Sequence, residues 1–254
     1  MELLGLRVRK GKLGEIAYAG INALIPVVLL LLIHGFDSIY PALALVFLSK
    51  WRILSLRPRF WWINIKANSV DLLVGMSVVG LLYLSMTSLI LQLVIVLLYG
   101  FWMLYLKHRS GISSIHWQAG IAQFFALTVL FSLSTTVNDF LIVLGCWVIG
   151  YSVARHVTSA YDENSVELLS GLWGLLTAQF GWILYYWTTA YDLSLPIMIP
   201  QIALVMLVLS YAATRLYSAA KKDQLSVALV RLTSIYSILL MLVILLFSHW
   251  SVVI

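Results

Sequence analysis

The chain has 254 residues, of which 62% are apolar and 10% are charged, and its formal net charge at pH 7 is +6. A water-soluble domain usually carries about 25% charged residues, so this composition excludes a soluble domain of the same length. The basic residues flank long apolar runs and do not gather in one soluble segment, which argues against a nucleic-acid partner.

Apolar runs of about 18 or more residues are typical of membrane-spanning helices, because a helix satisfies its own backbone hydrogen bonds within lipid. In chain order the runs predict nine spans, at residues 16–34, 38–54, 69–86, 88–106, 115–133, 139–154, 166–187, 196–216 and 232–250. The first run is too long for the core of a signal peptide, so we expect an uncleaved span. The second is the least regular, since Lys50 and Arg52 lie near its end, where long basic side chains can reach the membrane surface. The predicted fold is an all-α, polytopic integral membrane helical bundle, formed by residues 1–254 as a single membrane domain.

The distribution of charge predicts the topology. With nine spans and a cytoplasmic N-terminus, the inner segments are residues 1–15, 50–68, 107–114, 155–165 and 215–231, and they contain all 16 lysines and arginines. The outer turns carry only Asp37, Asp139 and Asp192 as charges. Short loops rich in lysine and arginine stay in the cytoplasm, so we expect the N-terminus inside and the C-terminus outside. The very short outer turns are typical of a bacterial cytoplasmic membrane, and we expect a multi-pass protein of that cell membrane.

Two octapeptides 96 residues apart are nearly identical. Residues 68–75 read NSVDLLVG, residues 164–171 read NSVELLSG, and each opens an apolar run. Residues 19–21 and 119–121 both read AGI, at a similar offset. One interpretation is a duplication, with parallel repeats at residues 16–107 and 115–217 and an extra helix at residues 232–250. The other is that Asn68 and Asn164 independently cap two helices, each with an acidic residue three positions later.

Five polar residues lie well inside the predicted spans: Asn22, Ser77, Gln123, Thr177 and Gln179. A polar group in hydrocarbon is costly unless it is hydrogen-bonded, so we expect these side chains to face protein or water. Pro26 also lacks the N–H that would bond the Asn22 carbonyl, which leaves an acceptor at membrane depth. The set is interpreted either as a substrate-binding pocket between two halves of the protein or as ordinary hydrogen bonding between helices.

The segment at residues 50–66 combines basic and aromatic side chains, among them Arg57, Arg59, Trp61 and Trp62. This combination is typical of a segment that lies against anionic lipid headgroups at the inner membrane surface. The two arginines could hold a phosphate through paired guanidinium contacts. The alternative is an anchor for topology without a specific ligand.

Small residues at a spacing of four predict two close helix contacts. One set is Ser170, Gly174 and Ala178, and the other is Ser210, Thr214 and Ser218. We expect the first set to place the span at residues 166–187 at the centre of the bundle.

No catalytic motif is found. The inner turn at residues 155–167 holds His156, Asp162 and Glu163, which could perform acid–base chemistry, but no nucleophile signature accompanies them and a solvated loop explains them. The other histidines lie on both membrane faces without ligand spacing, and Cys146 is the only cysteine. We therefore expect no bound metal and no cofactor.

Three functions are compatible with these patterns. The repeat and the buried amides favour a transporter or channel for a small solute, although no span has a charged residue near its middle, as proton- and cation-coupled carriers usually have. The second is a non-catalytic membrane subunit or scaffold, whose partner would be another membrane protein or a second copy. The third, an enzyme acting on a lipid or lipid-linked substrate at the inner face, has the least support.

Overall fold

The computed structural model describes residues 12–50, 55, 57–134, 136–187, 190–191 and 196–247, with side chains from residue 20 onward. Nearly all of these residues are helical. The helices are α1 (Lys12–Phe36), α2 (Tyr40–Leu48), the 3-10 turn η1 (Pro58–Phe60), α4 (Trp61–Ala67), α5 (Ser69–Leu84), α6 (Leu89–Phe101), the π-helical turn η2 (Trp102–Leu106), α7 (Ile112–Ser132), α8 (Asp139–Ser159), α9 (Val166–Tyr186), α10 (Gln201–Lys221) and α11 (Val227–Leu246). The short strands β1 (Ala190–Tyr191) and β2 (Ile199–Pro200) pair antiparallel between α9 and α10.

Six helices in the described part of the chain are long and apolar enough to cross a membrane: α6 with η2, and each helix from α7 to α11. Residues 58–67 and α5 form a further candidate that is bent by 69°. Helix α1 has 25 residues, and its stretch Gly20–Phe36 is apolar. The nine residues of α2 span about 13.5 Å, less than the roughly 30 Å of hydrocarbon, while residues 51–54 of the predicted second span lie outside the described residues. The predicted class, an all-α multi-pass membrane protein, is confirmed.

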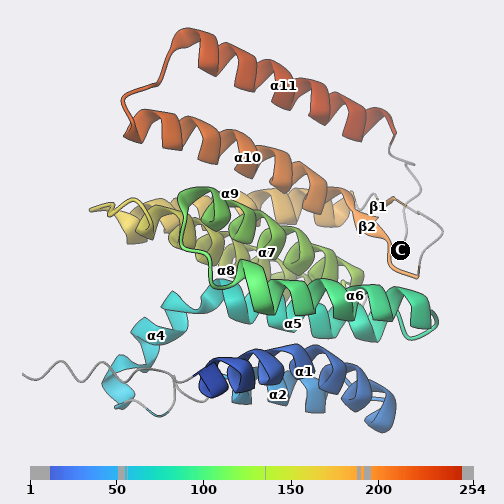
Figure 1. Ribbon diagram of the computed structural model, residues 1–254. Helices are drawn as coiled ribbons and strands as arrows, with labels where there is room; N and C mark the ends of the chain where they lie inside the picture. Colours follow the sequence, from blue (N-terminus) through green and yellow to red (C-terminus); the bar gives the residue numbers. More distant parts are fainter. Residues whose placement is uncertain are drawn as a thin grey trace, which may run out of the picture.

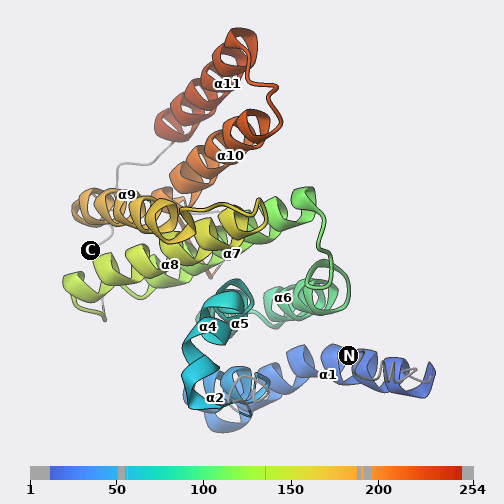
Figure 2. The same ribbon diagram turned by 90° about the vertical axis from the view of Figure 1, so that its left-hand side faces the viewer.

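The helices form one elongated bundle, with α1 and α2 at one edge and α11 at the other (Figure 1 and Figure 2). The connection from α2 to α4 and the turns at residues 107–111, 160–165 and 222–226 lie together at one end of the bundle, which we call the basic end (Figure 1). Every lysine and arginine in the described part of the chain lies at this end or within two helical turns of it. Asp37 and Asp139 lie at the opposite end, in the turn after α1 and at the start of α8.

The helices form two rings of four with the same order of neighbours. In the first ring, α1 and α5 each pack against both α2 and α6. In the second ring, α7 and α9 each pack against both α8 and α10. Helix α11 packs against α10 outside the second ring. The rings meet where α5 contacts α7 and α8, so α5 is the central helix, and the prediction that the span at residues 166–187 is central is wrong.

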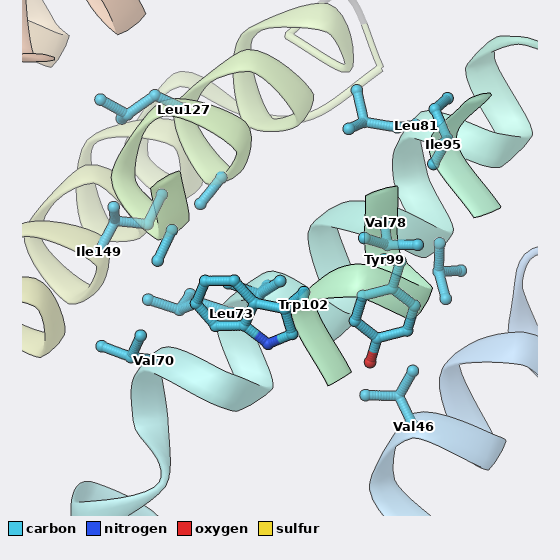
Figure 3. Close-up of a cluster of buried hydrophobic side chains, with 14 of the residues drawn as sticks. Val46, Val70, Leu73, Val78, Leu81, Ile95, Tyr99, Trp102, Leu127 and Ile149 are labelled. Carbon is cyan, nitrogen blue, oxygen red and sulfur yellow. The ribbon is translucent and has the colours of Figure 1, made fainter. Parts of the chain in front are cut away.

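Apolar side chains fill the first ring and continue into the joint between the rings (Figure 3). Val46 of α2, Leu73 of α5 and Tyr99 of α6 lie on one side of this cluster, and Leu127 of α7 and Ile149 of α8 lie on the other. Helices α5 and α7 approach closely at Gly80, where an added Cβ would lie 2.4 Å from Val129 Cγ1. A continuous apolar core therefore joins the two rings.

Helices α8 and α9 are in the closest contact of the fold. Ser170, Gly174 and Ala178 are all buried on α9, as their spacing predicts. An added Cβ at Gly174 would lie 2.9 Å from the backbone oxygen of Trp147, and one at Gly150 would lie 2.3 Å from Thr177 Oγ1. The absence of side chains at these glycines lets the two backbones come together.

Replacing Gly174 by alanine should therefore destabilise the α8–α9 contact, because the new methyl group meets a backbone carbonyl that cannot rotate away. We expect Gly174→Ala to lower the free energy of unfolding by about 1–3 kcal/mol, measured by thermal unfolding in detergent. Gly171→Ala is the control, since it lies on the same helix and its added Cβ meets nothing within 4 Å. Equal unfolding temperatures for the two variants would contradict the packing.

Candidate functional site

A cavity of about 960 Å³ lies between the four helices of the second ring and α11. Its wall is formed by the parts of α7, α8 and α9 nearest the basic end, by most of α10, and by Leu240 and Ile244 of α11. Apolar side chains such as Val153 and Leu207 make up most of the lining. Sites that hold whole small molecules usually measure about 300–1,000 Å³, so the cavity could accommodate a long hydrocarbon chain.

Small side chains leave this space open. The lining includes Ala119, Gly120, Ala154 and Ala213. Ser210, Thr214 and Ser218 of α10 line it as well. Ser210 also contacts α7 through Gln123, so the predicted helix contact is present at that residue. Thr214 Oγ1 donates to the backbone oxygen of Ser210 at 2.7 Å, within its own helix. The small residues of α9 close a helix contact, whereas those of α10 also line a cavity.

Polar side chains line the part of the cavity nearest the basic end, which we call its mouth. His116 and Tyr217 line the cavity, and both contact Tyr161. The Tyr161 hydroxyl lies 3.1 Å from His116 Nε2, and its ring packs edge-on against Tyr217 with centroids 5.1 Å apart. Tyr217 donates its hydroxyl to the Glu163 carboxylate at 2.6 Å, and Lys221 pairs with the same carboxylate. The bonds from Lys221 and Tyr217 hold the pKa of Glu163 below its ordinary value.

Arg215 is the only lysine, arginine or acid among the described residues that line the cavity. Its Nη1 donates to the Tyr211 hydroxyl at 2.6 Å, and its guanidinium carbon lies 5.8 Å from the centroid of the Tyr211 ring. The cavity is therefore apolar through most of its length and carries one positive charge on its wall.

Gln123 is the predicted site residue closest to this cavity in the structure. Its side chain is fully buried, and its Oε1 accepts a hydrogen bond at 2.5 Å from Ser210, which lines the cavity. Within the described part of the chain, the Gln123 amide nitrogen is buried without a hydrogen-bond partner, as is that of Asn22 in the first ring.

The other predicted site residues do not assemble around the cavity. Ser77 and Thr177 are buried, and each donates its hydroxyl to the backbone oxygen one turn earlier in its own helix. Gln179 is exposed on the outer surface of α9. The structure therefore does not bring Asn22, Ser77, Gln123, Thr177 and Gln179 together in one pocket between the halves.

The predicted lipid-headgroup segment lies on the surface of the basic end. All four of its named side chains are exposed: Arg57 just before η1, Arg59 on η1, and Trp61 and Trp62 on α4. The Arg59 guanidinium carbon lies 4.6 Å from the centroid of the Phe60 ring. This arrangement suits contact with a membrane surface. Neither arginine forms an ion pair within the described residues.

The acidic residues of the repeated octapeptides form ion pairs with lysine and arginine side chains. Asp71 pairs with Lys50 and, at 2.9 Å, with Lys107, and Trp102 Nε1 lies 3.5 Å from its carboxylate. Burial and the neighbouring Lys107 lower the pKa of Lys50. The capping prediction for Asn68 is wrong, because its side-chain amide donates to the backbone oxygen of Asn64 and caps nothing in α5.

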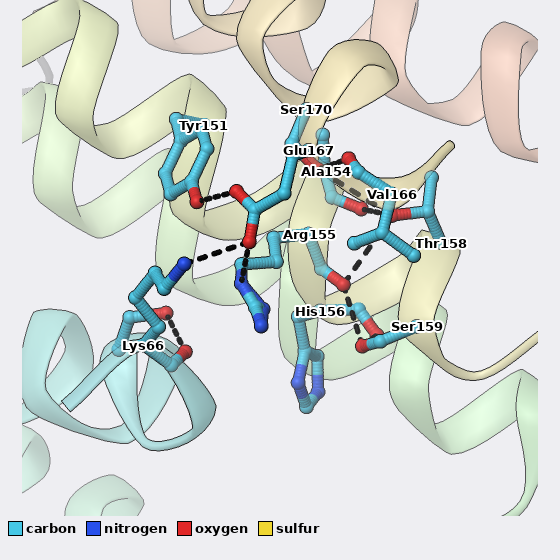
Figure 4. A network of polar contacts seen from close by, with 11 residues as sticks. Lys66, Tyr151, Ala154, Arg155, His156, Thr158, Ser159, Val166, Glu167 and Ser170 are labelled. Carbon is cyan, nitrogen blue, oxygen red and sulfur yellow. Dashed lines mark hydrogen bonds and ion pairs between the residues drawn. The ribbon is translucent and has the colours of Figure 1, made fainter. Parts of the chain in front are cut away.

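Glu167 has the corresponding position in the second ring. It pairs with Lys66 at 2.7 Å and with Arg155 at 3.7 Å, and it accepts a hydrogen bond from Tyr151 (Figure 4). The residue that precedes α9 is Ser165, without a side-chain capping bond, so the capping prediction for Asn164 is also wrong. Because Lys66 lies on α4, this cluster links the two halves of the chain.

His156 does not contact the acidic residues of its turn. Its Nε2 lies 2.9 Å from Oε1 of Gln118, whose amide nitrogen donates to the backbone oxygens of Leu106 and Arg109. Asp162 is exposed, and Glu163 is bonded to Lys221 and Tyr217. Within the described residues no group of three histidine, cysteine or acidic side chains could hold a metal ion.

Comparison of the chain with protein-family models, with curated proteins and with solved structures returns no match. The functional argument therefore depends on the cavity and its mouth.

Proposed function

We propose that this membrane protein binds a long-chain amphiphile in the cavity of the second ring. The observation that supports the proposal is a cavity of about 960 Å³ that is apolar along most of its length and polar at the basic end. A hydrocarbon chain would pack against Val153 and Leu207, and a polar headgroup would lie near His116 and Tyr217. Inside a membrane the gain comes from van der Waals packing, because lipid tails are as apolar as the lining.

We propose that the protein binds the amphiphile without catalysing a reaction on it. The acid at the mouth, Glu163, is held by Lys221 and Tyr217 and is not positioned as a free base. A small polar solute would need hydrogen-bonding partners along the cavity, but the hydroxyl of Thr214 is already bonded within its own helix. An amphiphile needs polar partners only at one end.

Filling the cavity should abolish this binding. We expect Ala213→Trp, which projects an indole from the cavity wall, to remove the tightly held lipid seen by native mass spectrometry of the detergent-washed protein. Ala220→Trp is the matched control, since Ala220 is exposed on the same helix and does not line the cavity. Retention of the same lipid by both variants would show that the lipid binds elsewhere.

A second candidate function is transport of a small solute. It is favoured by the buried amide nitrogens of Asn22 and Gln123, which have no partner and could bind a solute in transit. These two residues lie in different rings, so each ring would contribute separately to a pathway.

Transport predicts a loss of flux when either amide is removed. In proteoliposomes screened with a panel of radiolabelled solutes, Asn22→Leu and Gln123→Leu should each reduce uptake about tenfold, the expected cost of losing a bond to a buried group. Gln179→Leu is the control, because Gln179 is exposed on the surface of the bundle. Equal uptake by all three variants and the unaltered protein would argue against a transport pathway through these amides.

We further propose nine spans in a bacterial cytoplasmic membrane, with the N-terminus and the basic end inside, the C-terminus outside and the two rings related by duplication. The grouping of the described lysines and arginines at one end supports the orientation. The shared order of neighbours and the clusters around Asp71 and Glu167 support the duplication.

Parallel repeats place equivalent turns on the same side of the membrane. In a Cys146→Ala background, single cysteines at Asp37 and Asp139 should react with a membrane-impermeant maleimide added to intact cells. Single cysteines at Phe60 and Asp162 should react only after the cells are permeabilised. All four positions are exposed at the surface of the protein. Opposite labelling of Asp37 and Asp139 would exclude both the span count and the parallel repeat.

A further inference from the structure

The Arg215 side chain extends away from the basic end, along a face of α10 that lines the cavity. It lies six residues before the end of α10, and its Nη1 bonds to Tyr211, which is one turn farther from the basic end. Tyr211 is ten residues from the end of the helix, or about 15 Å along its axis. A long basic side chain near the end of a membrane helix usually extends toward the surface, away from hydrocarbon. The guanidinium of Arg215 instead lies along the wall of an apolar cavity.

This charge is not neutralised by the surrounding protein. No acidic side chain pairs with Arg215 in the described part of the chain, and none lines the cavity. Glu163 is held by Lys221, while Asp162 and Asp223 are exposed in the turns that follow α8 and α10. A cation beside an apolar space is costly without an anion, so the missing counter-ion is expected from the ligand.

The ligand must carry that negative charge at a particular position. Ser113 and Ser218 line the cavity together with Arg215, so two hydroxyl groups share this space with the guanidinium. Lys222 acts electrostatically on His116 at the mouth and adds a second positive charge there. A guanidinium has five N–H donors in a planar fork that matches a phosphate, and the Tyr211 hydroxyl occupies only part of it.

We propose that the amphiphile is an anionic phospholipid, whose phosphate diester is bound by Arg215 and whose acyl chain occupies the cavity. This inference rests on the proposed function and adds the class of headgroup. It differs from a general attraction of basic loops to the membrane surface, because one side chain on the cavity wall selects the ligand.

The test compares lipids that differ only in headgroup charge. The full-length protein is reconstituted in equimolar phosphatidylglycerol and phosphatidylcholine with the same acyl chains, extracted, washed in detergent and examined by native mass spectrometry. The lipid that Ala213→Trp fails to retain defines the cavity-bound fraction. Both lipids carry a phosphate diester, but in phosphatidylcholine the choline ammonium already neutralises it. We therefore expect phosphatidylglycerol to exceed phosphatidylcholine in this fraction by about tenfold for the unaltered protein.

Arg215→Gln should retain lipid in the cavity but lose the preference for phosphatidylglycerol, and Arg215→Lys should keep part of it. Arg231→Gln is the matched control, because Arg231 is exposed on α11 near the basic end and does not line the cavity. A cavity fraction with equal amounts of the two lipids, or an equal loss of preference in Arg215→Gln and Arg231→Gln, would overturn the headgroup assignment alone. No lipid lost on Ala213→Trp would overturn the proposed function itself.

Discussion

The cost of an unpaired charge in hydrocarbon governs the arrangement of this bundle. The described lysines and arginines gather at one end, and two acidic residues at the base of α5 and α9 collect several of them. Asp71 and Glu167 also lie in the first turn of their helices, where the helix dipole favours negative charge. Each acid therefore stabilises its own helix start and holds neighbouring helix ends in register. The bond from Lys66 to Glu167 extends this network from one half of the chain to the other.

The two rings share this scaffold but fill their interiors differently. In the first ring the interior is packed: a Cβ added at Gly75 would lie 2.8 Å from Val46 Cγ1 and 3.3 Å from the Tyr99 hydroxyl. In the second ring α8 and α9 are in intimate contact, while the face of α10 that includes Ser210 and Thr214 lines open space. The same order of helices is thus closely packed at Gly75 in the first ring, whereas in the second ring a cavity lies between α9 and α10 near the basic end.

Composition was sufficient to predict the class of fold, since few structures other than apolar helices satisfy their backbone in lipid. The spacing of Ser170, Gly174 and Ala178 was sufficient to predict one close contact, because a small residue at each turn lets a facing helix approach closely. The same spacing on α10 predicted a helix contact but not the cavity beside it, since a pattern of small residues does not reveal whether open space also lies opposite. The capping motifs failed because Asn68 bonds back to Asn64 and because Ser165, not Asn164, directly precedes α9, while Asp71 and Glu167 pair with lysines far away in sequence.

The burial of polar groups shows a similar limit. Residue type and depth identified Gln123 correctly as a buried side chain, and they placed the exposed Gln179 in the same class. The two residues lie at similar depth in their helices, and only the direction of the side chain separates them. The direction of a side chain depends on which face of its helix meets a neighbouring helix. Apolar periodicity does not identify that face in a membrane protein, because lipid and protein core both favour apolar residues.

A lateral cavity in a membrane protein fills with hydrocarbon whether or not a particular ligand is intended, so the lining alone does not distinguish a binding site from a lipid-filled gap. The distinction depends on a feature that bulk lipid tails cannot satisfy. Arg215 supplies one, because its guanidinium lies on the wall of the cavity beside Tyr211 and has no acidic partner in the described chain. An amphiphile with an anionic headgroup packs against the apolar wall and also neutralises this charge. A hydrocarbon tail without a headgroup only packs against the wall. Selectivity therefore resides at Arg215, while the apolar part of the cavity determines only the length of the hydrocarbon chain that fits.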